Sequence, residues 1–320
     1  MEGDKIMCND EGANLDNTNS LPEFLPTIVP GESAGAWPLL SVKVSFFGSG
    51  SGFSVTVSTC HRICDASSIL TFISGWAATA KAESSNVVMM NIPSFSATTI
   101  YPPPPCSFQS SSIDGLYEPK SKCVTNIFFF KSSKIAKLNR RAMSETVPVP
   151  TPLDLRPRIP PAVLSKDAVG NLQAPFFLKE GSESKMEIAE IVAEFRKAKE
   201  VVNEMIKENL ATTITATTLG PNLLSLLGKL ASELTPDIDL FPMSSWCRKP
   251  FYEVDFGCGS PVWIGSTGHV IHNAVFVLLL DSKDGEDVEA WISLPGQDMS
   301  VLVREQEVFA YAVINPPVLI

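Results

Sequence analysis

A histidine and an aspartate four residues apart, His61 and Asp65, are the residues of this chain best suited to chemistry. They follow the segment 53–58, where Phe, Val and Val alternate with Ser, Thr and Ser, and this period of two predicts a half-buried strand. His61 shares the parity of the apolar positions, so its ring points to the buried side if the strand extends that far. Residues 66–81 then predict a helix with one apolar face. An imidazole at such a junction can be held against a buried substrate as a general base.

Other candidate sites have less support. A histidine-based metal site would need His61, His269 and His272 together, and a spacing of three on a strand puts the last two on opposite faces, so we expect no metal. The chain has no G-x-S-x-G elbow, and the apolar company of Cys60 and Cys64 predicts inert buried thiols. Taken alone, H-x-x-x-D also fits a core histidine that has found a hydrogen-bond partner.

Alternating and periodic segments predict an α/β fold with strands and helices mixed along the chain. The glycine-rich segment 48–52 lacks the lysine and the helix of a P-loop, so it predicts a hairpin between strands 39–47 and 53–58. Prolines 102–105 and those between 146 and 162 predict extended linkers. Further strands are predicted at 123–130, 251–255, 261–265, 273–280 and 288–294, and further helices at 131–143, 184–209, 222–233 and from the residue after Pro295 to about 311.

Composition excludes several classes of protein. With 320 residues, 44% of them hydrophobic, the chain can build a sizeable core. Its net charge of −10 argues against nucleic acid or an anionic membrane as the main partner. The longest apolar run, 274–280, is too short to span a bilayer, and the acidic N-terminus does not resemble a secretory signal. Seven scattered cysteines predict free thiols in a reducing compartment, so we expect a cytoplasmic protein.

Several stretches together resemble a known family. H-R-I-C-D-A-S at 61–67 resembles the H-x-x-x-D-A signature of the plant BAHD acyltransferases, which move an acyl group from a coenzyme A thioester to an alcohol or amine. S-W-C-R-K-P-F-Y-E-V-D-F-G-C-G at 245–259 resembles that family's second signature, D-F-G-W-G. The order and rough spacing of these stretches match the family over nearly the whole chain, and the nearest branch is the alkaloid-acetylating vinorine synthase type. Further similar stretches are C-N-D-E-G at 8–12, L-R-P-R at 155–158 with G-N at 170–171, and V-E-A-W-I-S-L at 288–294.

The resemblance implies an architecture and a reaction. Two chloramphenicol-acetyltransferase-like α/β domains of mixed sheet flanked by helices are expected, residues 1–122 carrying H-x-x-x-D and residues 123–320 carrying D-F-G-C-G. The co-substrate would be acyl-CoA, with acetyl-CoA favoured by the branch, and the acceptor a small-molecule alcohol such as an alkaloid. No metal takes part, and the protein is expected to be a monomer.

The resemblance also assigns roles to residues. His61 would take the proton of the acceptor hydroxyl as it attacks the thioester, and could then reprotonate the departing CoA thiolate. Asp65 would point away from the substrate and pair with Arg156, fixing the loop that aims His61. Asp255, Phe256, Gly257 and Gly259 would form a structural turn distant from the reacting atoms, because glycine tolerates tight backbone conformations.

The chain departs from the family pattern in three places. Family members carry strands and helices ahead of the point where this sequence starts, they have a helix between residues 146 and 155, and they have Trp where Cys258 stands. We therefore expect an incomplete first domain with an exposed sheet edge and apolar surface. Two alternatives stay open: a shortened, catalytically impaired homologue that binds a ligand or has no function, and a structural or interaction protein.

Overall fold

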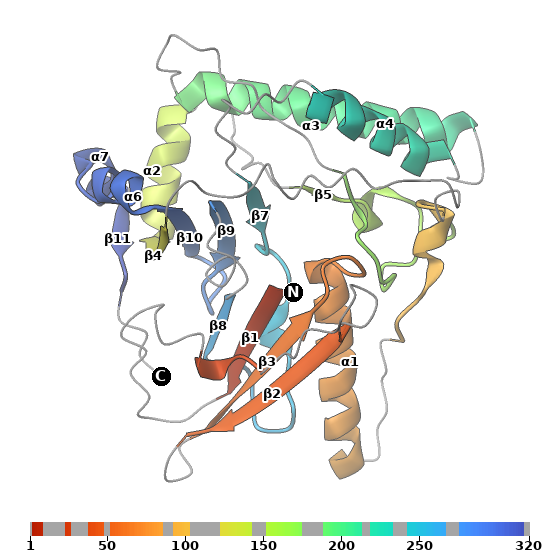
Figure 1. The fold of residues 1–320 in the computed structure, drawn as a ribbon, viewed down its shortest axis with the longest axis horizontal. Helices are drawn as coiled ribbons and strands as arrows, with labels where there is room; N and C mark the ends of the chain where they lie inside the picture. The colour runs from red at the N-terminus through yellow and green to blue at the C-terminus, as the bar shows by residue number, and fades with distance from the viewer. Residues whose placement is uncertain are drawn as a thin grey trace.

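The computed structural model describes residues 2–8, 23–26, 38–47, 52–85, 92–102, 122–142, 152–174, 188–212, 218–232, 242–266 and 275–316, and every structural statement below concerns these segments. They form two main sheets with helices packed around them, and a two-stranded pair, β5 (Leu153–Asp154) with β6 (Gln173–Ala174) (Figure 1). Strands and helices are mixed along the chain, as the sequence predicts.

The first sheet has the order β2-β3-β1-β8 and is antiparallel throughout. Its strands are β1 (Glu2–Cys8), β2 (Leu40–Phe46), β3 (Phe53–Thr59) and β8 (Trp263–Ser266). The predicted hairpin is confirmed, because β2 pairs with β3 from Leu40 opposite Thr59 to Phe46 opposite Phe53. β8 belongs to the first sheet although it lies in the C-terminal part of the chain. The two sheets therefore do not follow the predicted domain boundary at residue 122, and that boundary stays a prediction.

The strand that leads to His61 is buried on both faces. Val55 and Val57 pack in a core cluster with Ile69 and Ile73 of α1 (Ala66–Ser85), the helix predicted at 66–81. The polar residues between them are equally buried, and Ser54 and Thr56 have no accessible surface. The half-buried prediction is therefore wrong. The apolar face of β3 packs in the cluster that includes α1, and the side chains of the polar face, Ser54, Thr56 and Ser58, are buried as well.

The second sheet has the order β11-β4-β10-β9-β7, with only β7 and β9 parallel. Its long central pair, β4 (Cys123–Phe130) and β10 (Val288–Pro295), and the neighbouring β9 (Phe276–Asp281) lie close to the predicted ranges. Two three-residue strands were not predicted, β7 (Met243–Ser245) and β11 (Ala312–Ile314). A strand of three residues is too short to show an alternation of apolar and polar side chains.

One predicted strand is wrong. Residues 251–255 form a 3-10 turn, η8 (Phe251–Glu253), followed by extended chain rather than a strand. Phe251 and Val254 are the buried residues of this segment. Their spacing of three matches the 3-10 repeat, whereas the prediction depended on a period of two.

The helices lie on the outside of the sheets. α3 and α4 cross one end of the molecule, and the pair α6 and α7 lies beside β11 (Figure 1). The predicted C-terminal helix is two short helices separated by a turn. Two further 3-10 turns are η4 (Ser96–Thr99) and η6 (Arg156–Arg158). The remaining helices are α2 (Ser132–Ala142), α3 (Ile188–Thr212), α4 (Leu219–Ser232), α6 (Gly296–Leu302) and α7 (Gln306–Tyr311).

Among the described residues, β2 has a strand on one side only, and it carries a row of exposed apolar side chains. Val42 of this row also lines an apolar hollow of about 400 Å³ between β2 and α1, with Phe72 and Trp76. The expected sheet edge and apolar surface are thus present. The exposed side chains are Leu40, Val42, Val44 and Phe46.

None of the helices in the described segments has the length and apolar character needed to cross a bilayer.

Candidate active site

His61 lies in the turn between β3 and α1, and its side chain is exposed. β3 ends at Thr59, and the amide of Ile63 donates to the carbonyl of Cys60 at 3.0 Å to form the turn. The strand therefore does not extend to His61, and the condition under which its ring was expected on the buried side is not met. The alternation stops two residues before His61. The exposed imidazole therefore lies just past the end of a buried strand, in the turn that leads into α1.

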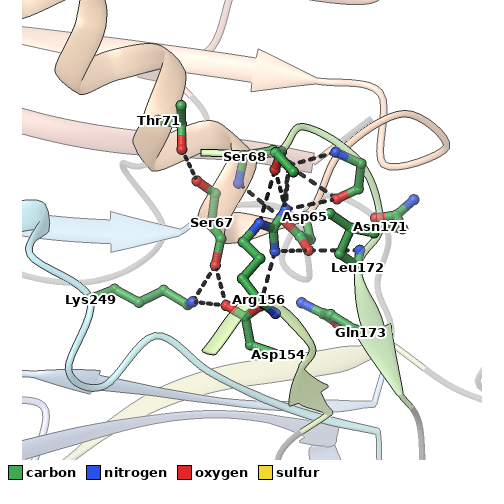
Figure 2. Close-up of polar contacts among 12 residues, drawn as sticks. Asp65, Ser67, Ser68, Thr71, Asp154, Arg156, Asn171, Leu172, Gln173 and Lys249 are labelled. Carbon is green, nitrogen blue, oxygen red and sulfur yellow. Dashed lines mark hydrogen bonds and ion pairs between the residues drawn. The ribbon is translucent and has the colours of Figure 1, made fainter. Parts of the chain in front are cut away.

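Behind this turn, Asp65 and Arg156 form a buried, two-pronged ion pair. Arg156 Nη1 lies 2.9 Å from Asp65 Oδ2, and Nη2 lies 3.0 Å from Oδ1. The Asp65 side chain has no exposed surface and that of Arg156 is 4% exposed. The ion pair that the family resemblance implies is present in the structure (Figure 2). Bidentate pairs of this kind fix direction as well as distance.

Both charges are saturated by further hydrogen bonds, as a buried ion pair requires. Asp65 Oδ1 accepts from the Ser68 amide and the Ser68 hydroxyl, each at 2.9 Å, and Oδ2 accepts from the Leu172 amide at 3.0 Å. The bond to Ser68 N makes Asp65 the N-cap of α1. Arg156 Nε and Nη2 donate to the carbonyl of Ala168 at 2.9 and 2.8 Å. One carboxylate thus joins α1 to two loops of the later chain.

The G-N pair at 170–171 contacts both the first turn of α1 and the turn that carries His61. The Gly170 amide donates to the Ser68 hydroxyl at 3.0 Å, and a Cβ on Gly170, at φ 154°, would lie 2.7 Å from Ala97 Cβ. Asn171 Nδ2 donates to the backbone carbonyl of His61 at 2.5 Å. The residue at position 171 therefore fixes the main chain of His61 directly. The sequence suggested only that this pair belongs to a family stretch, and gave it no role.

Three residues of the site were missed by sequence reasoning: Ser67, Asp154 and Lys249. Asp154 Oδ2 accepts from the Ser67 hydroxyl at 2.7 Å and lies 3.1 Å from Lys249 Nζ. Burial raises the pKa of Asp154, but Lys249, the Ser67 hydrogen bond and Arg156 outweigh it, and the net pKa lies below its ordinary value. These residues are far apart in sequence, so no local pattern indicates their contact.

The D-F-G-C-G turn contacts α1 well away from His61. Asp255 Oδ1 accepts from the amides of Gly257 and Gly259 at 2.8 and 2.9 Å, and its other oxygen pairs with Lys81 of α1. Both glycines have positive φ, 99° and 98°, which glycine adopts without strain. The Phe256 ring lies edge-on to Trp76 of α1, 4.9 Å between centroids. These contacts tie the turn to the C-terminal half of the helix.

Replacing Asp255 with alanine is expected to destabilise the fold by about 1–2 kcal/mol at pH 7, because two turn amides and Lys81 lose their acceptor. The Lys81 hydrogen bond, followed by that of the Gly257 amide, holds the pKa of Asp255 below its ordinary 3.8. The folded-state pKa lies below that of the unfolded chain, so this stabilisation is present above about pH 4 and is lost as the pH falls through the folded-state pKa. Urea unfolding at pH 7 and pH 3 measures it. The difference in the free energy of unfolding between wild type and Asp255→Ala should become smaller at pH 3. Glu253 is an exposed acid of the same segment, and Glu253→Ala should unfold with the wild-type free energy at both pH values.

His269 and His272 lie outside the described residues. Within the described segments, no group of three or more His, Cys, Asp or Glu side chains is arranged to hold a metal ion. Cys64 is buried and Cys60 partly so, and both are free thiols.

The fold matches those of solved structures. The structure of vinorine synthase superposes with a TM-score of 0.71 at 23% identity, covering 93% of this chain and 73% of that one. F. graminearum TRI101 complexed with coenzyme A and deoxynivalenol superposes with a TM-score of 0.55 at 16% identity, covering 90% of this chain and 73% of that one. The chain therefore has the two-domain fold of the vinorine synthase type.

The sequence comparisons define the family. The model of the Transferase family matches residues 5–154 and again 152–309. BAHD acyltransferase BIA1 of Arabidopsis thaliana is 50% identical over 99% of this chain and 82% of its own length. Stemmadenine O-acetyltransferase of Catharanthus roseus is 29% identical over 82% of this chain and 64% of its own length. The chain belongs to the BAHD acyltransferases of the Transferase family, enzymes that transfer acyl groups.

Proposed function

We propose that this enzyme transfers an acyl group, acetyl in the first instance, from acyl-CoA to a hydroxyl of a small specialised metabolite such as an alkaloid, with His61 as general base. Family membership supports acyl transfer, and the bound coenzyme A of TRI101 supports a CoA thioester as donor. The name of the Catharanthus relative, an O-acetyltransferase, supports acetyl as the group and a hydroxyl as the acceptor. In this proposal the enzyme works as a monomer in the cytoplasm.

The observation that carries the role of His61 is the way its turn is held. The backbone of His61 is bonded by Asn171, and four residues later Asp65 is fixed by Arg156 and by the start of α1. Asp65 makes these bonds with both of its oxygens, so it is not the group that meets substrate. The imidazole of His61 is an exposed side chain of the turn that these bonds hold.

The chemistry then needs one proton acceptor and no acyl-enzyme intermediate. A hydroxyl within hydrogen-bond reach of the imidazole gives up its proton as its oxygen attacks the thioester carbonyl carbon. The tetrahedral oxyanion collapses, the carbon–sulfur bond breaks, and the thiolate of CoA leaves. The proton held on His61 can pass to that thiolate, which returns the imidazole to its starting form.

The test is transfer by the purified protein with acetyl-CoA and with longer acyl-CoAs, against a panel of plant alcohols that includes alkaloids. We expect release of free CoA thiol that depends on the acceptor, and a product heavier by one acyl group in mass spectrometry. Saturating CoA, at 100 times its dissociation constant, should stabilise the fold by about 2.7 kcal/mol. CoA binding without transfer to any alcohol would contradict the proposal and favour a ligand-binding homologue.

A further inference from the structure

The ammonium group of Lys249 occupies a position between two segments that are distant in sequence. Its Nζ lies 3.1 Å from Asp154 Oδ2 and is hydrogen-bonded to the hydroxyl of Ser67 in the first turn of α1 (Figure 2). The side chains of Lys249 and Asp154 are 17% and 24% exposed. Three segments therefore meet at this point: the start of α1, strand β5, and the turn that follows β7.

This contact is continuous with the ion pair behind His61. The second oxygen of Asp154, Oδ1, accepts from the backbone amide and from Nη1 of Arg156, each at 3.1 Å. The same Nη1 lies 2.9 Å from Asp65. Two carboxylates thus share one guanidinium, and Lys249 supplies the second positive charge that balances the cluster. Without it, Asp154 Oδ2 keeps the Ser67 hydroxyl, while Oδ1 depends on Arg156, which it shares with Asp65; Arg158 bonds the backbone carbonyl of Asp154 and acts on its carboxylate through charge alone.

The backbone of Lys249 is itself firmly placed. Its amide donates to the carbonyl of Trp246 at 3.1 Å, and its carbonyl accepts from the amide of Phe251 at 2.7 Å. The buried rings of Trp246 and Phe251 stack at 5.1 Å on either side of this turn in sequence. A lysine on a packed turn, with its stem covered, loses less freedom on pairing than one on an open surface.

The same segment contacts α1 a second time. Asp255 and Phe256 contact Lys81 and Trp76, so residues 249–256 touch the helix near its first turn and again in its C-terminal half. Ser67 and Lys81 are about 21 Å apart along a helix axis. Contacts this far apart fix the direction of a helix as well as its position. Lys249 makes the contact at the N-terminal end of α1, which directly follows the turn that carries His61.

We propose that Lys249 is a positioning residue for His61: by neutralising Asp154 and holding Ser67, it keeps Arg156 on Asp65 and so fixes the turn that carries the imidazole. This inference rests on the proposed function, in which that imidazole is the base. Lys249 itself does not touch the reacting atoms.

The experiment reads out the His61 environment without requiring activity. Histidine ring carbons of the full chain are labelled, and the His61 cross-peak in the ¹H–¹³C spectrum is assigned with His61→Ala. We expect Lys249→Met to move that cross-peak by more than its linewidth and to lower kcat about tenfold or more, with less than a twofold change in the KM for acyl-CoA. Lys249→Arg, which keeps the charge, should restore most of kcat. Lys207→Met, which removes a lysine from an exposed ion pair of α3, should leave both readouts unchanged.

The outcomes separate this inference from the proposed function. A His61 cross-peak that stays in place in a folded Lys249→Met protein overturns the positioning role, whatever the activity. The wild-type protein could instead lack transfer activity while Lys249→Met still moves the His61 cross-peak. That result contradicts the proposed function but supports the structural link between Lys249 and His61. If Lys249→Met does not fold, Asp154→Asn removes the partner instead. It is expected to move the same cross-peak, and an unmoved one overturns the role equally.

Discussion

His61→Ala is expected to lower the rate of acyl transfer by about 100- to 10,000-fold, the contribution of a positioned general base. The reason is that an alcohol attacks a thioester poorly unless its proton is removed as the new bond forms. Asp65 is not placed to take over, because both of its oxygens are committed to Arg156, Ser68 and Leu172. The measurement is kcat and KM for acyl-CoA and acceptor, on the acceptor identified by the product assay.

Thermal unfolding should hardly change in this variant. The His61 side chain is exposed in a turn, and substitutions at such positions shift stability by about 0.5 kcal/mol or less. Arg62→Ala is the matched control, since Arg62 is the next exposed residue of the same turn. It is expected to keep the wild-type rate. An unchanged rate in His61→Ala, or an equal loss in Arg62→Ala, would rule out His61 as the base.

Sequence reasoning succeeded where the pattern is local and long enough. The eight-residue strand β4 and the helix α1 lie close to the predicted ranges, because β4 is rich in β-branched and aromatic residues and the apolar face of α1 repeats over several turns. It failed for β7 and β11, whose three residues are too few to show a period. It also failed for β3, because alternation shows which residues are apolar but not that a central strand will have both of its faces covered.

The residues of the candidate site show the same difference between local patterns, which the sequence reveals, and distant contacts, which it does not. H-x-x-x-D marks a turn between a strand and a helix, and the structure places it there. The pairing of Asp65 with Arg156, 91 positions apart, came from the family resemblance and not from the residues themselves. Ser67, Asp154 and Lys249 were not found at all, since 87 and 95 positions separate Asp154 from its two partners. Contacts of this length depend on how the two sheets and their connections pack, which no window of sequence records.

Arg156→Met is expected to destabilise the fold by about 3–5 kcal/mol, the cost of leaving one partner of a buried ion pair without the other. Asp65 would keep its bonds from Ser68 and Leu172, but its negative charge would have no counter-ion in a site with no exposed surface. The carbonyl of Ala168 would lose both of its donors from the guanidinium. Denaturant unfolding at pH 7 measures the loss directly.

A double-mutant cycle shows whether the loss comes from the stranded charge. Asp65→Asn combined with Arg156→Met removes both charges while the amide oxygen can still accept from Ser68, so the double variant should be more stable than the sum of the two single losses predicts, by at least about 1 kcal/mol. Lys207→Met breaks an exposed ion pair with Glu204 and should leave unfolding unchanged. Additive losses would mean that Asp65 and Arg156 stabilise the fold independently, and the ion pair would then not be what fixes the turn before α1. Coupled losses, with transfer activity lost wherever the pair is broken in a folded protein, are the result expected if the pair holds His61 in place.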